Sequence, residues 1–190
     1  MSLLPNTLTA APLVLRRWNQ VDLPAVMGAI EVSIEDLAMW LPWAKQGVPS
    51  IDSERDVFAT GAVDFDHDAD WAYSIIEMDT EELVGGCGLH PRDGHTCLEI
   101  GYWVRSDRRA RGYATIAARC LTDAAFQFVP EAERVEVRMD VNNVASARVP
   151  LKLGFELDGE EQREIVTPGH TGRGLVWSTA RSRWTALSGS

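Results

Sequence analysis

The stretch Val104-Arg-Ser-Asp-Arg-Arg-Ala-Arg-Gly-Tyr-Ala-Thr115 joins a predicted strand to a predicted helix through a short arginine-rich loop. Backbone N–H groups at the start of a helix lack partners and lie at the positive end of its dipole. Small residues such as Gly112 and Ala114 let a phosphate approach them closely. These residues alone allow either a phosphate site or a solvated basic loop that caps a surface helix. Walker and Rossmann loops are excluded, because neither GxxxxGK(S/T) nor GxGxxG is present.

Charge is unevenly distributed along the 190 residues. The formal net charge of −10 comes from 28 acidic and 18 basic side chains, and it disfavours binding to nucleic acid or to an anionic membrane. Five arginines and one acid lie between Arg105 and Arg119, whereas residues 52–82 contain 11 acids and one base. We expect the basic segment to hold a specific anion. The acidity elsewhere either favours a cationic partner or serves only solubility.

Length and composition predict one domain over residues 1–190, with a disordered tail from about Ser188. Asp22 and Ser53 are the expected N-caps of the first two helices. Short turns such as Pro91-Arg-Asp-Gly94 favour hairpins, so we predict a mixed α/β (α+β) fold with a mostly antiparallel sheet of about six to seven strands. The predicted strands are 13–18, 71–77, 83–90, 96–104, 134–139, 155–165 and 174–179, and the predicted helices are 22–32, 53–61, 112–130 and 143–153.

Cysteine and histidine usage points away from metals and disulfides. The three cysteines are odd in number and lack CxxC spacing, which fits a reducing cytoplasm. The histidines lie in or beside predicted turns without ligand spacing, so we expect surface residues and no metal site. No apolar run is long enough to span a bilayer, and no secretory signal is recognisable, so a cytoplasmic location is expected. The residues concerned are Cys87, Cys97, Cys120, His67, His90, His95 and His170.

Three blocks, in order, resemble the GNAT N-acetyltransferase superfamily. Arg109-x-x-Gly112-x-Ala114 resembles its acetyl-CoA loop, Q/R-x-x-G-x-G/A, and Glu99-Ile-Gly-Tyr-Trp-Val104 resembles its fourth strand. Asn143-Val-Ala-Ser146, followed by Leu151-Lys-Leu-Gly-Phe155, resembles the next helix and strand. Together with Leu13-x-Leu-Arg16 near the start, they point to the RimJ/RimL branch, which includes ribosomal-protein N-terminal acetyltransferases.

The resemblance implies a GNAT-like sheet with helices on both faces, splayed between its fourth and fifth strands, with acetyl-CoA as co-substrate. Backbone groups near Trp103 and Val104 would pair with the pantetheine arm. Backbone amides of the loop would hold the pyrophosphate, with charge-assisted contacts from arginines. The loop residues are Arg109, Ala110, Arg111, Gly112, Tyr113, Ala114 and Thr115.

For catalysis the resemblance implies direct attack of a neutral amine on the thioester, which requires a proton acceptor and a proton donor. Glu99, on the fourth strand, is the first choice of acceptor, the other interpretation being a surface carboxylate. Ser146 would donate to the leaving thiolate and Asn143 would bond the pantetheine amide, while either residue can also cap the helix. Alternative acceptors on the later strands are Glu160, Glu161 and Glu164.

The expected activity is therefore acetyl-CoA-dependent N-acetylation of a primary amine, with a protein N-terminal amine as first choice. A small amine (a polyamine, amino acid or aminoglycoside) is the second, and a non-catalytic acyl-CoA-binding sensor is the alternative from another class. A homodimer is suggested only by the resemblance. Pro150, inside a predicted helix, removes one backbone donor and should bend that helix.

Overall fold

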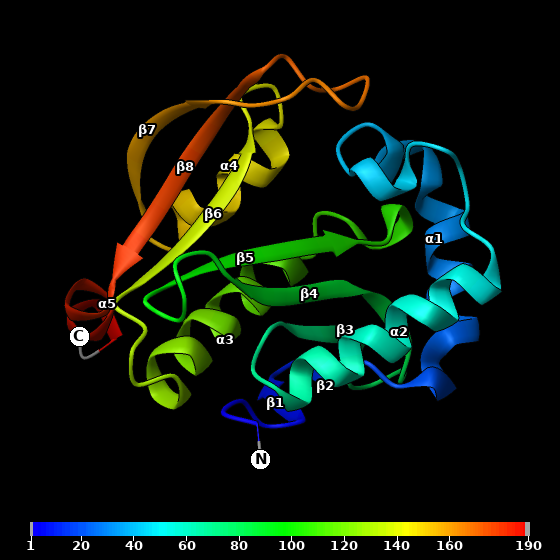
Figure 1. Ribbon diagram of the computed structural model, residues 1–190, viewed down its shortest axis with the longest axis horizontal. Helices are drawn as coiled ribbons and strands as arrows, with labels where there is room; N and C mark the ends of the chain where they lie inside the picture. The colour runs from blue at the N-terminus through cyan, green and yellow to red at the C-terminus, as the bar shows by residue number, and fades with distance from the viewer. Residues whose placement is uncertain (1, 189–190) are drawn as a thin grey trace.

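The computed structural model describes residues 2–188, which fold around one central sheet (Figure 1). The strands are β1 (Thr7–Ala10), β2 (Leu13–Arg17), β3 (Trp71–Glu77), β4 (Leu83–Pro91), β5 (Cys97–Val104), β6 (Arg134–Asp140), β7 (Glu156–Gln162) and β8 (Arg173–Ala180). The α-helices are α1 (Leu23–Ala38), α2 (Ile51–Asp66), α3 (Tyr113–Phe128), α4 (Val144–Lys152) and α5 (Arg181–Ser188). Short 3-10 turns are η1 (Gln20–Asp22), η2 (Pro42–Ala44) and η3 (Ser106–Arg108).

The eight strands of the described chain lie in the order β1-β2-β3-β4-β5-β6-β8-β7. Every neighbouring pair is antiparallel except β5 and β6, which are parallel. Helices α1 and α2 cover one face and α3 covers the other (Figure 1). The predicted mixed α/β fold, with a mostly antiparallel sheet and helices on both faces, is confirmed with eight strands rather than six or seven.

Strand β5 separates two apolar cores. Its residues Leu98 and Ile100 are buried against α3, in the larger core. Successive side chains of a strand point to opposite faces, so Trp103 turns the other way and packs against the smaller core. That core consists mainly of α1 residues, to which α2 contributes Phe58 and β4 contributes Leu83. One strand therefore presents its side chains to both layers of helices.

The sheet is splayed next to β5, as predicted. Strand β6 pairs with β5 only over three residues, Cys97–Glu99 opposite Arg134–Glu136. Beyond Glu136, β6 continues along β8, with which it pairs over its whole length. Residues 100–104 of β5 thus have β4 on one side and an open backbone edge on the other.

The C-terminal end of α3 is capped by a side chain from another element. The guanidinium of Arg181 donates hydrogen bonds to the carbonyls of Ala132 (2.9 Å), Val129 (2.8 Å), Pro130 (3.2 Å) and Phe126. A cation at a helix C-terminus satisfies free carbonyls and opposes the negative end of the dipole. Arg181 thereby ties the end of α3 to the junction of β8 and α5.

Several predicted boundaries were wrong for local reasons. Helix α2 begins earlier, because Ser50 rather than Ser53 is its N-cap and accepts a hydrogen bond from the Ser53 amide (3.1 Å). Asp22 makes no capping bond and instead pairs with Arg16. Strand β1 and helix α5 were not predicted. Ser188, where a disordered tail was expected to begin, is the last residue of α5, and residues 189–190 lie outside the described part of the chain. No helix within residues 2–188 combines the length and apolarity needed to cross a membrane.

Candidate active site

The arginine-rich loop leads into α3 through two residues with left-handed backbone. Ala110 has φ of 61° and Gly112, the N-cap, has φ of 83°. The first intrahelical hydrogen bond of α3 runs from the Ile116 amide to the Gly112 carbonyl (3.0 Å). Helix geometry therefore leaves the amides of Tyr113, Ala114 and Thr115 without partners inside the helix. A Cβ built on Gly112 meets no atom within 4 Å, so there is open space at the N-cap, and free amides at a helix start suit a phosphate.

The arginine side chains of this loop are already paired with carboxylates. Arg109 contacts Asp36 of α1 (2.7 Å), and Arg111 lies 3.7 Å from Glu77 of β3. Arg105 pairs with Asp107 (2.9 Å) and Arg108 with Glu82. The Tyr113 hydroxyl also donates to Glu77. The positively charged segment seen in the sequence is thus largely neutralised, and the groups left for an anion are mainly backbone amides.

The open edge of β5 presents alternate backbone groups. The amide of Arg105 donates to the Val84 carbonyl on β4 (2.8 Å). Bonded residues alternate in an antiparallel pair, so Val104, Tyr102 and Ile100 direct their N–H and C=O groups away from β4, toward the splay. By the same alternation the backbone of Trp103 faces β4. Val104 is therefore positioned to pair with an extended ligand arm, whereas Trp103 contributes its side chain elsewhere.

Helix α4 borders the splay on the other side. Asn143 is its N-cap, and its side-chain oxygen accepts a hydrogen bond from the Ser146 amide (3.1 Å). The Tyr102 hydroxyl lies 3.0 Å from both the carbonyl and the Oγ of Ser146. Pro150 sits inside α4 without interrupting it. Tyr102 and Ser146 thus meet across the splay, beside the open edge of β5.

A cavity of about 750 Å³ lies on the opposite side of β5, between α1, α2 and strands β3 to β5. Aromatic side chains form its walls, glycines of β4 and β5 form its floor, and four carboxylates from or near α2 stand around it. The aromatic residues that line it are Trp18, Trp43, Phe58, Tyr102 and Trp103. The floor glycines are Gly85, Gly86, Gly88 and Gly101, and the acids are Glu54, Asp56, Asp64 and Asp70. The cavity suits an acceptor with a positive charge.

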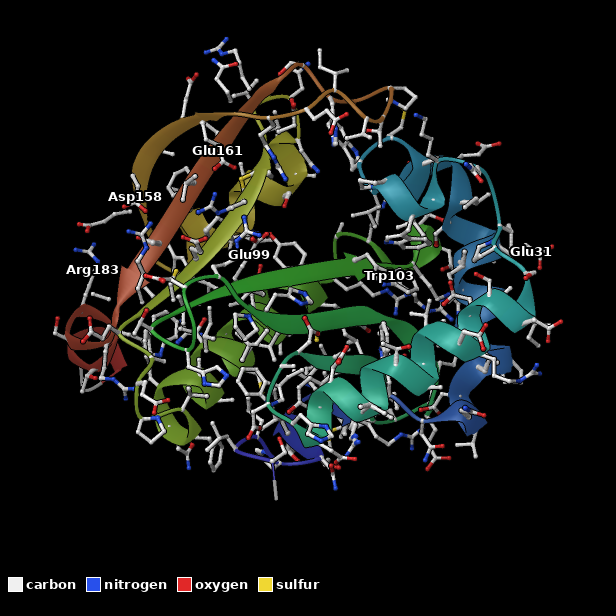
Figure 2. The ribbon with its side chains drawn as sticks, viewed as in Figure 1. Glu31, Glu99, Trp103, Asp158, Glu161 and Arg183 are labelled. Carbon is white, nitrogen blue, oxygen red and sulfur yellow. The ribbon has the colours of Figure 1, made fainter. Side chains whose placement is uncertain are left out.

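Glu99 does not line this cavity. Figure 2 shows it near the start of the splay, with Trp103 toward the other end of β5. Its carboxylate contacts Arg92 (3.1 Å) and lies 3.9 Å from Arg138. Burial raises the pKa of the Glu99 carboxyl above its ordinary value, although Arg92, His90 and Arg138 act in the opposite direction.

The alternative glutamates on the later strands are also engaged or exposed. Glu160 forms a two-pronged pair with Arg173 (2.8 and 2.9 Å), and Glu161 contacts Arg138 and lies 3.7 Å from Arg163. Glu164 follows β7 on an exposed loop. None of the three lines the cavity.

His90 is exposed at the surface, as expected from the sequence, but it also lines the cavity, which was not predicted. It lies on β4, lines the cavity, and its Nδ1 is 2.5 Å from a carboxylate oxygen of Asp70. The signal in the sequence was the run Gly86, Gly88, His90, which falls on one face of a strand at spacing two. A strand face that carries glycines beside a titratable side chain indicates that a ligand or another backbone approaches the strand closely.

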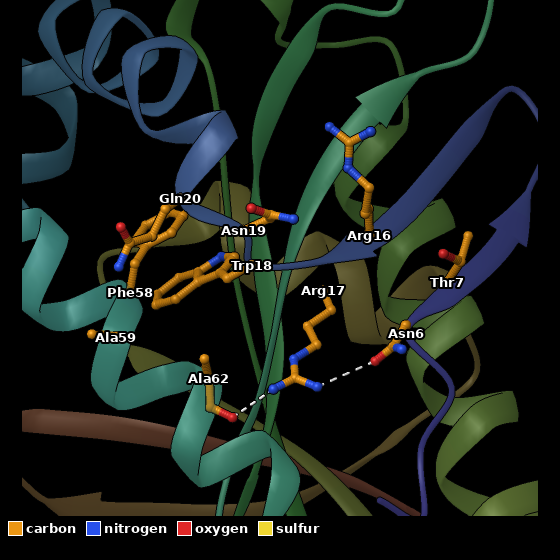
Figure 3. A pocket seen from close by; sticks show the side chains of 10 residues that line it. All are labelled: Asn6, Thr7, Arg16, Arg17, Trp18, Asn19, Gln20, Phe58, Ala59 and Ala62. Carbon is orange, nitrogen blue, oxygen red and sulfur yellow. Dashed lines mark hydrogen bonds between the residues drawn. The ribbon is translucent and has the colours of Figure 1, made fainter.

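A second hollow, of about 510 Å³, lies between α2 and the chain segments at both ends of the β1–β2 hairpin (Figure 3). This hollow shares with the cavity Trp18 and Phe58, whose rings stack at 4.5 Å and form the wall between the two. Its arginines are occupied: Arg17 donates to the Ala62 carbonyl (2.6 Å) and to Asp66, and Arg16 pairs with Asp22. The guanidinium groups of Arg16 and Arg17 are therefore not free to bind a substrate in this hollow.

No cluster of three His, Cys, Asp or Glu side chains suited to a metal occurs among residues 2–188. The three cysteines are free thiols. Burial raises the pKa of Cys97 and of Cys120 to about 11, so neither thiol is ionised near neutral pH.

Comparison with known proteins agrees with this architecture. The model of the acetyltransferase (GNAT) domain matches residues 12–156, so the chain belongs to the GNAT acetyltransferase family. A putative ribosomal N-acetyltransferase from Bacillus subtilis, YdaF, is 30% identical over 103 residues, which is 54% of this chain and 56% of that protein. The chain spans about half the length of the curated relatives it matches.

Two solved structures show the same fold at low identity. RimL, a ribosomal L7/L12 alpha-N-protein acetyltransferase in complex with coenzyme A, superposes with a TM-score of 0.83 at 18% identity, covering 92% of this chain and 97% of that chain. The microcin C7 self-immunity acetyltransferase MccE, in complex with acetyl-CoA and AMP, also has a TM-score of 0.83 at 18% identity, covering 94% and 98%. These likenesses establish the fold and leave the acceptor open.

Proposed function

We propose that this chain is an acetyl-CoA-dependent N-acetyltransferase that transfers the acetyl group directly to the N-terminal amine of a protein. The observation that carries the proposal is the double role of β5. Its backbone edge from Ile100 to Val104 is open toward the splay and the start of α3, while Gly101 and Trp103 on one of its faces line the acceptor cavity. A thioester aligned along that edge would meet an amine entering from the cavity.

The cofactor side is assigned to the residues that border the splay. Amides from Arg109 through Thr115 would hold the pyrophosphate, with Tyr113, Ala114 and Thr115 of the first helical turn as principal donors. Val104 would pair with the pantetheine arm as an added strand does. Asn143 uses its side-chain oxygen as the helix cap, which leaves its NH₂ group for a pantetheine carbonyl.

The proposed transfer balances as follows. The amine nitrogen forms a bond to the thioester carbonyl carbon, the C–S bond breaks, and the amine gives up a proton to a base. The departing thiolate takes a proton, for which the Ser146 hydroxyl is the proposed donor, and the serine regains a proton from solvent; the Tyr102 hydroxyl lies 3.0 Å from the Ser146 Oγ. Glu99 remains one candidate for the base, although its contact with Arg92 and its place outside the cavity both weigh against it.

A protein N-terminus is preferred as acceptor for two reasons. RimL and YdaF carry names that assign them to ribosomal proteins. The cavity is open and acidic, which suits an ammonium group followed by an extended chain. MccE, named for self-immunity to a microcin, supports a small-molecule acceptor as the second candidate.

A panel assay tests this function. Peptides with a free N-terminus, the same peptides with a blocked N-terminus and an internal lysine, polyamines, amino acids and aminoglycosides are compared by release of free coenzyme A thiol. We expect only the free N-terminal peptides to be acetylated efficiently. Faster reaction with a polyamine or aminoglycoside would favour the second candidate. Tight acetyl-CoA binding without acetylation of any amine would favour a sensor.

A further inference from the structure

We propose that His90, oriented by Asp70, takes the proton from the acceptor amine. The inference rests on the proposed function and names the group that removes the proton at that site. It replaces Glu99, which sequence reasoning favoured, with a pair of residues on β4 and just before β3. Both His90 and Asp70 line the acceptor cavity.

The geometry fixes which nitrogen is available. The Nδ1 atom of His90 lies 2.5 Å from Oδ2 of Asp70, so Nδ1 carries the proton and Nε2 is left with a lone pair when the ring is neutral. Within residues 2–188, Nε2 has no hydrogen-bond partner. A carboxylate that orients an imidazole in this way leaves it ready to act as a base.

The neighbouring glycines make room for the imidazole ring. Gly88 and Gly101 face each other on β4 and β5, and His90 lies one step along the same face. A Cβ built on Gly101 would lie 2.9 Å from Nε2, and one built on Gly88 would lie 3.2 Å from it. The imidazole therefore occupies the space that side chains at these two positions would fill, on the part of β5 that borders the open edge.

Glu99 has a supporting part in this arrangement. It is the direct cross-strand neighbour of His90 and is held by Arg92 (3.1 Å). Its negative charge, with that of Asp70, stabilises the imidazolium that forms when Nε2 accepts a proton. Further charged groups near the site are Arg92 and the α2 carboxylates Glu54, Asp56 and Asp64.

Protons and bonds balance in the proposed step. The amine arrives as an ammonium ion and loses its first proton to solvent. During attack, as the C–N bond forms and the C–S bond breaks, the second proton passes from nitrogen to Nε2 of His90. The imidazolium then returns that proton to solvent and is ready for the next turnover.

The test compares His90→Gln with His67→Gln in the full chain. His67 lies at the exposed C-terminal end of α2, where its ring contacts the Val63 carbonyl, so it is a matched histidine outside the cavity. With the best acceptor from the panel, we expect His90→Gln to lower kcat/KM by about 100-fold and His67→Gln to leave it unchanged. Acetyl-CoA affinity and the melting temperature should stay within error of wild type for both.

Two further variants keep the proposal falsifiable. Burial lowers the pKa of His90, but the hydrogen bond and charge of Asp70, with Glu99, raise it overall. Activity that needs neutral His90 should therefore fall as the pH drops through this raised pKa. Asp70→Asn should move the acidic limb of the kcat/KM profile to lower pH, whereas a limb set by the amine itself would not move. His90→Gly should be partly rescued by added imidazole.

The outcomes separate this inference from the proposed function. Wild-type activity on the panel, together with an undiminished His90→Gln variant or an unmoved limb in Asp70→Asn, overturns the role of His90 alone. A larger loss in Glu99→Gln than in His90→Gln returns the base to Glu99. A wild-type chain that acetylates no amine overturns both proposals.

Discussion

The hydroxyl of Tyr102 on β5 donates a hydrogen bond to the carbonyl of Ser146 on α4, a carbonyl that lacks its usual donor four residues further along the helix. The intrahelical partner of Ser146 would be residue 150, and Pro150 has no N–H. Burial raises the pKa of the Tyr102 hydroxyl, so it remains a donor at neutral pH. A proline and a tyrosine far apart in the chain therefore complement each other across the splay.

Tyr102→Phe should destabilise the chain by roughly 1–2 kcal/mol, because it leaves the Ser146 carbonyl unpaired. In a Pro150→Ala background the loss should be smaller, since the alanine introduced there would supply the missing N–H. Urea unfolding of the two single variants and the double variant gives the coupling directly. Strictly additive effects would contradict the complementary roles of Tyr102 and Pro150.

Gly112→Ala should weaken acetyl-CoA binding, because an L residue at φ of 83° costs about 1 kcal/mol and shifts the amides that follow. Gly28→Ala is the matched control: Gly28 is exposed within α1, and its added Cβ meets nothing within 4 Å. That change should stabilise the chain by about 0.5–1 kcal/mol and leave affinity unchanged. Calorimetric titration and thermal melting measure the two effects. Equal acetyl-CoA affinities would argue against the loop as the phosphate site.

Arg181→Ala should cost about 2–3 kcal/mol, because several carbonyls at the end of α3 lose a charged donor. Arg181→Lys should recover part of this loss, since an ammonium group reaches fewer of them. Arg55→Ala, which removes an exposed pair with Asp52 on α2, should change stability by less than about 1 kcal/mol. Chemical denaturation ranks the three variants, and a similar cost for Arg55→Ala would refute the capping role.

The buried carboxylate of Asp140 should make stability depend on pH. Burial alone would raise its pKa, but amide donors from Asn142 (2.9 Å) and Thr171 (2.8 Å) outweigh burial and lower it below the ordinary value of 3.8. Its contribution is therefore complete above about pH 4 and is lost as the pH falls through the lowered pKa. Melting temperatures from pH 6 to pH 2 should fall more steeply in wild type than in Asp140→Asn. Parallel curves would contradict this assignment.

Most of the fold could be predicted from the sequence, because the residue patterns that indicate strands, turns and helices are local. The apolar run Trp71–Glu77 was predicted as a strand with the correct bounds, and Gly112 marked the start of α3 to within a residue. Strand β1 was not predicted, because it has only four residues and one buried side chain, Leu8. Helix α5 was not predicted, because it is held in place by contacts with residues distant in the sequence, such as the hydrogen bond from the Trp184 indole to Asp123 of α3 (2.7 Å). Such contacts have no local pattern.

The site was harder to predict because its chemistry depends on cross-strand neighbours. The sequence indicated Gly112, Asn143 and Ser146, which lie in motifs. It gave no reason to place Asp70 against His90, twenty residues away, because that contact follows from the register of β3 with β4. Nor could the sequence show that Arg92 forms an ion pair with the Glu99 carboxylate, or that carboxylates of other elements pair with the loop arginines.

The paired arginines of the loop bear on how the protein should respond to ionic strength. Four guanidiniums, of Arg105, Arg108, Arg109 and Arg111, face four carboxylates, so the loop offers little net charge to a phosphate. Attraction then depends on backbone dipoles at short range, which dissolved ions screen far less than they screen separated charges. Acetyl-CoA affinity should therefore change little between dilute buffer and molar salt. An enzyme built this way would bind its anionic co-substrate almost independently of the ions around it.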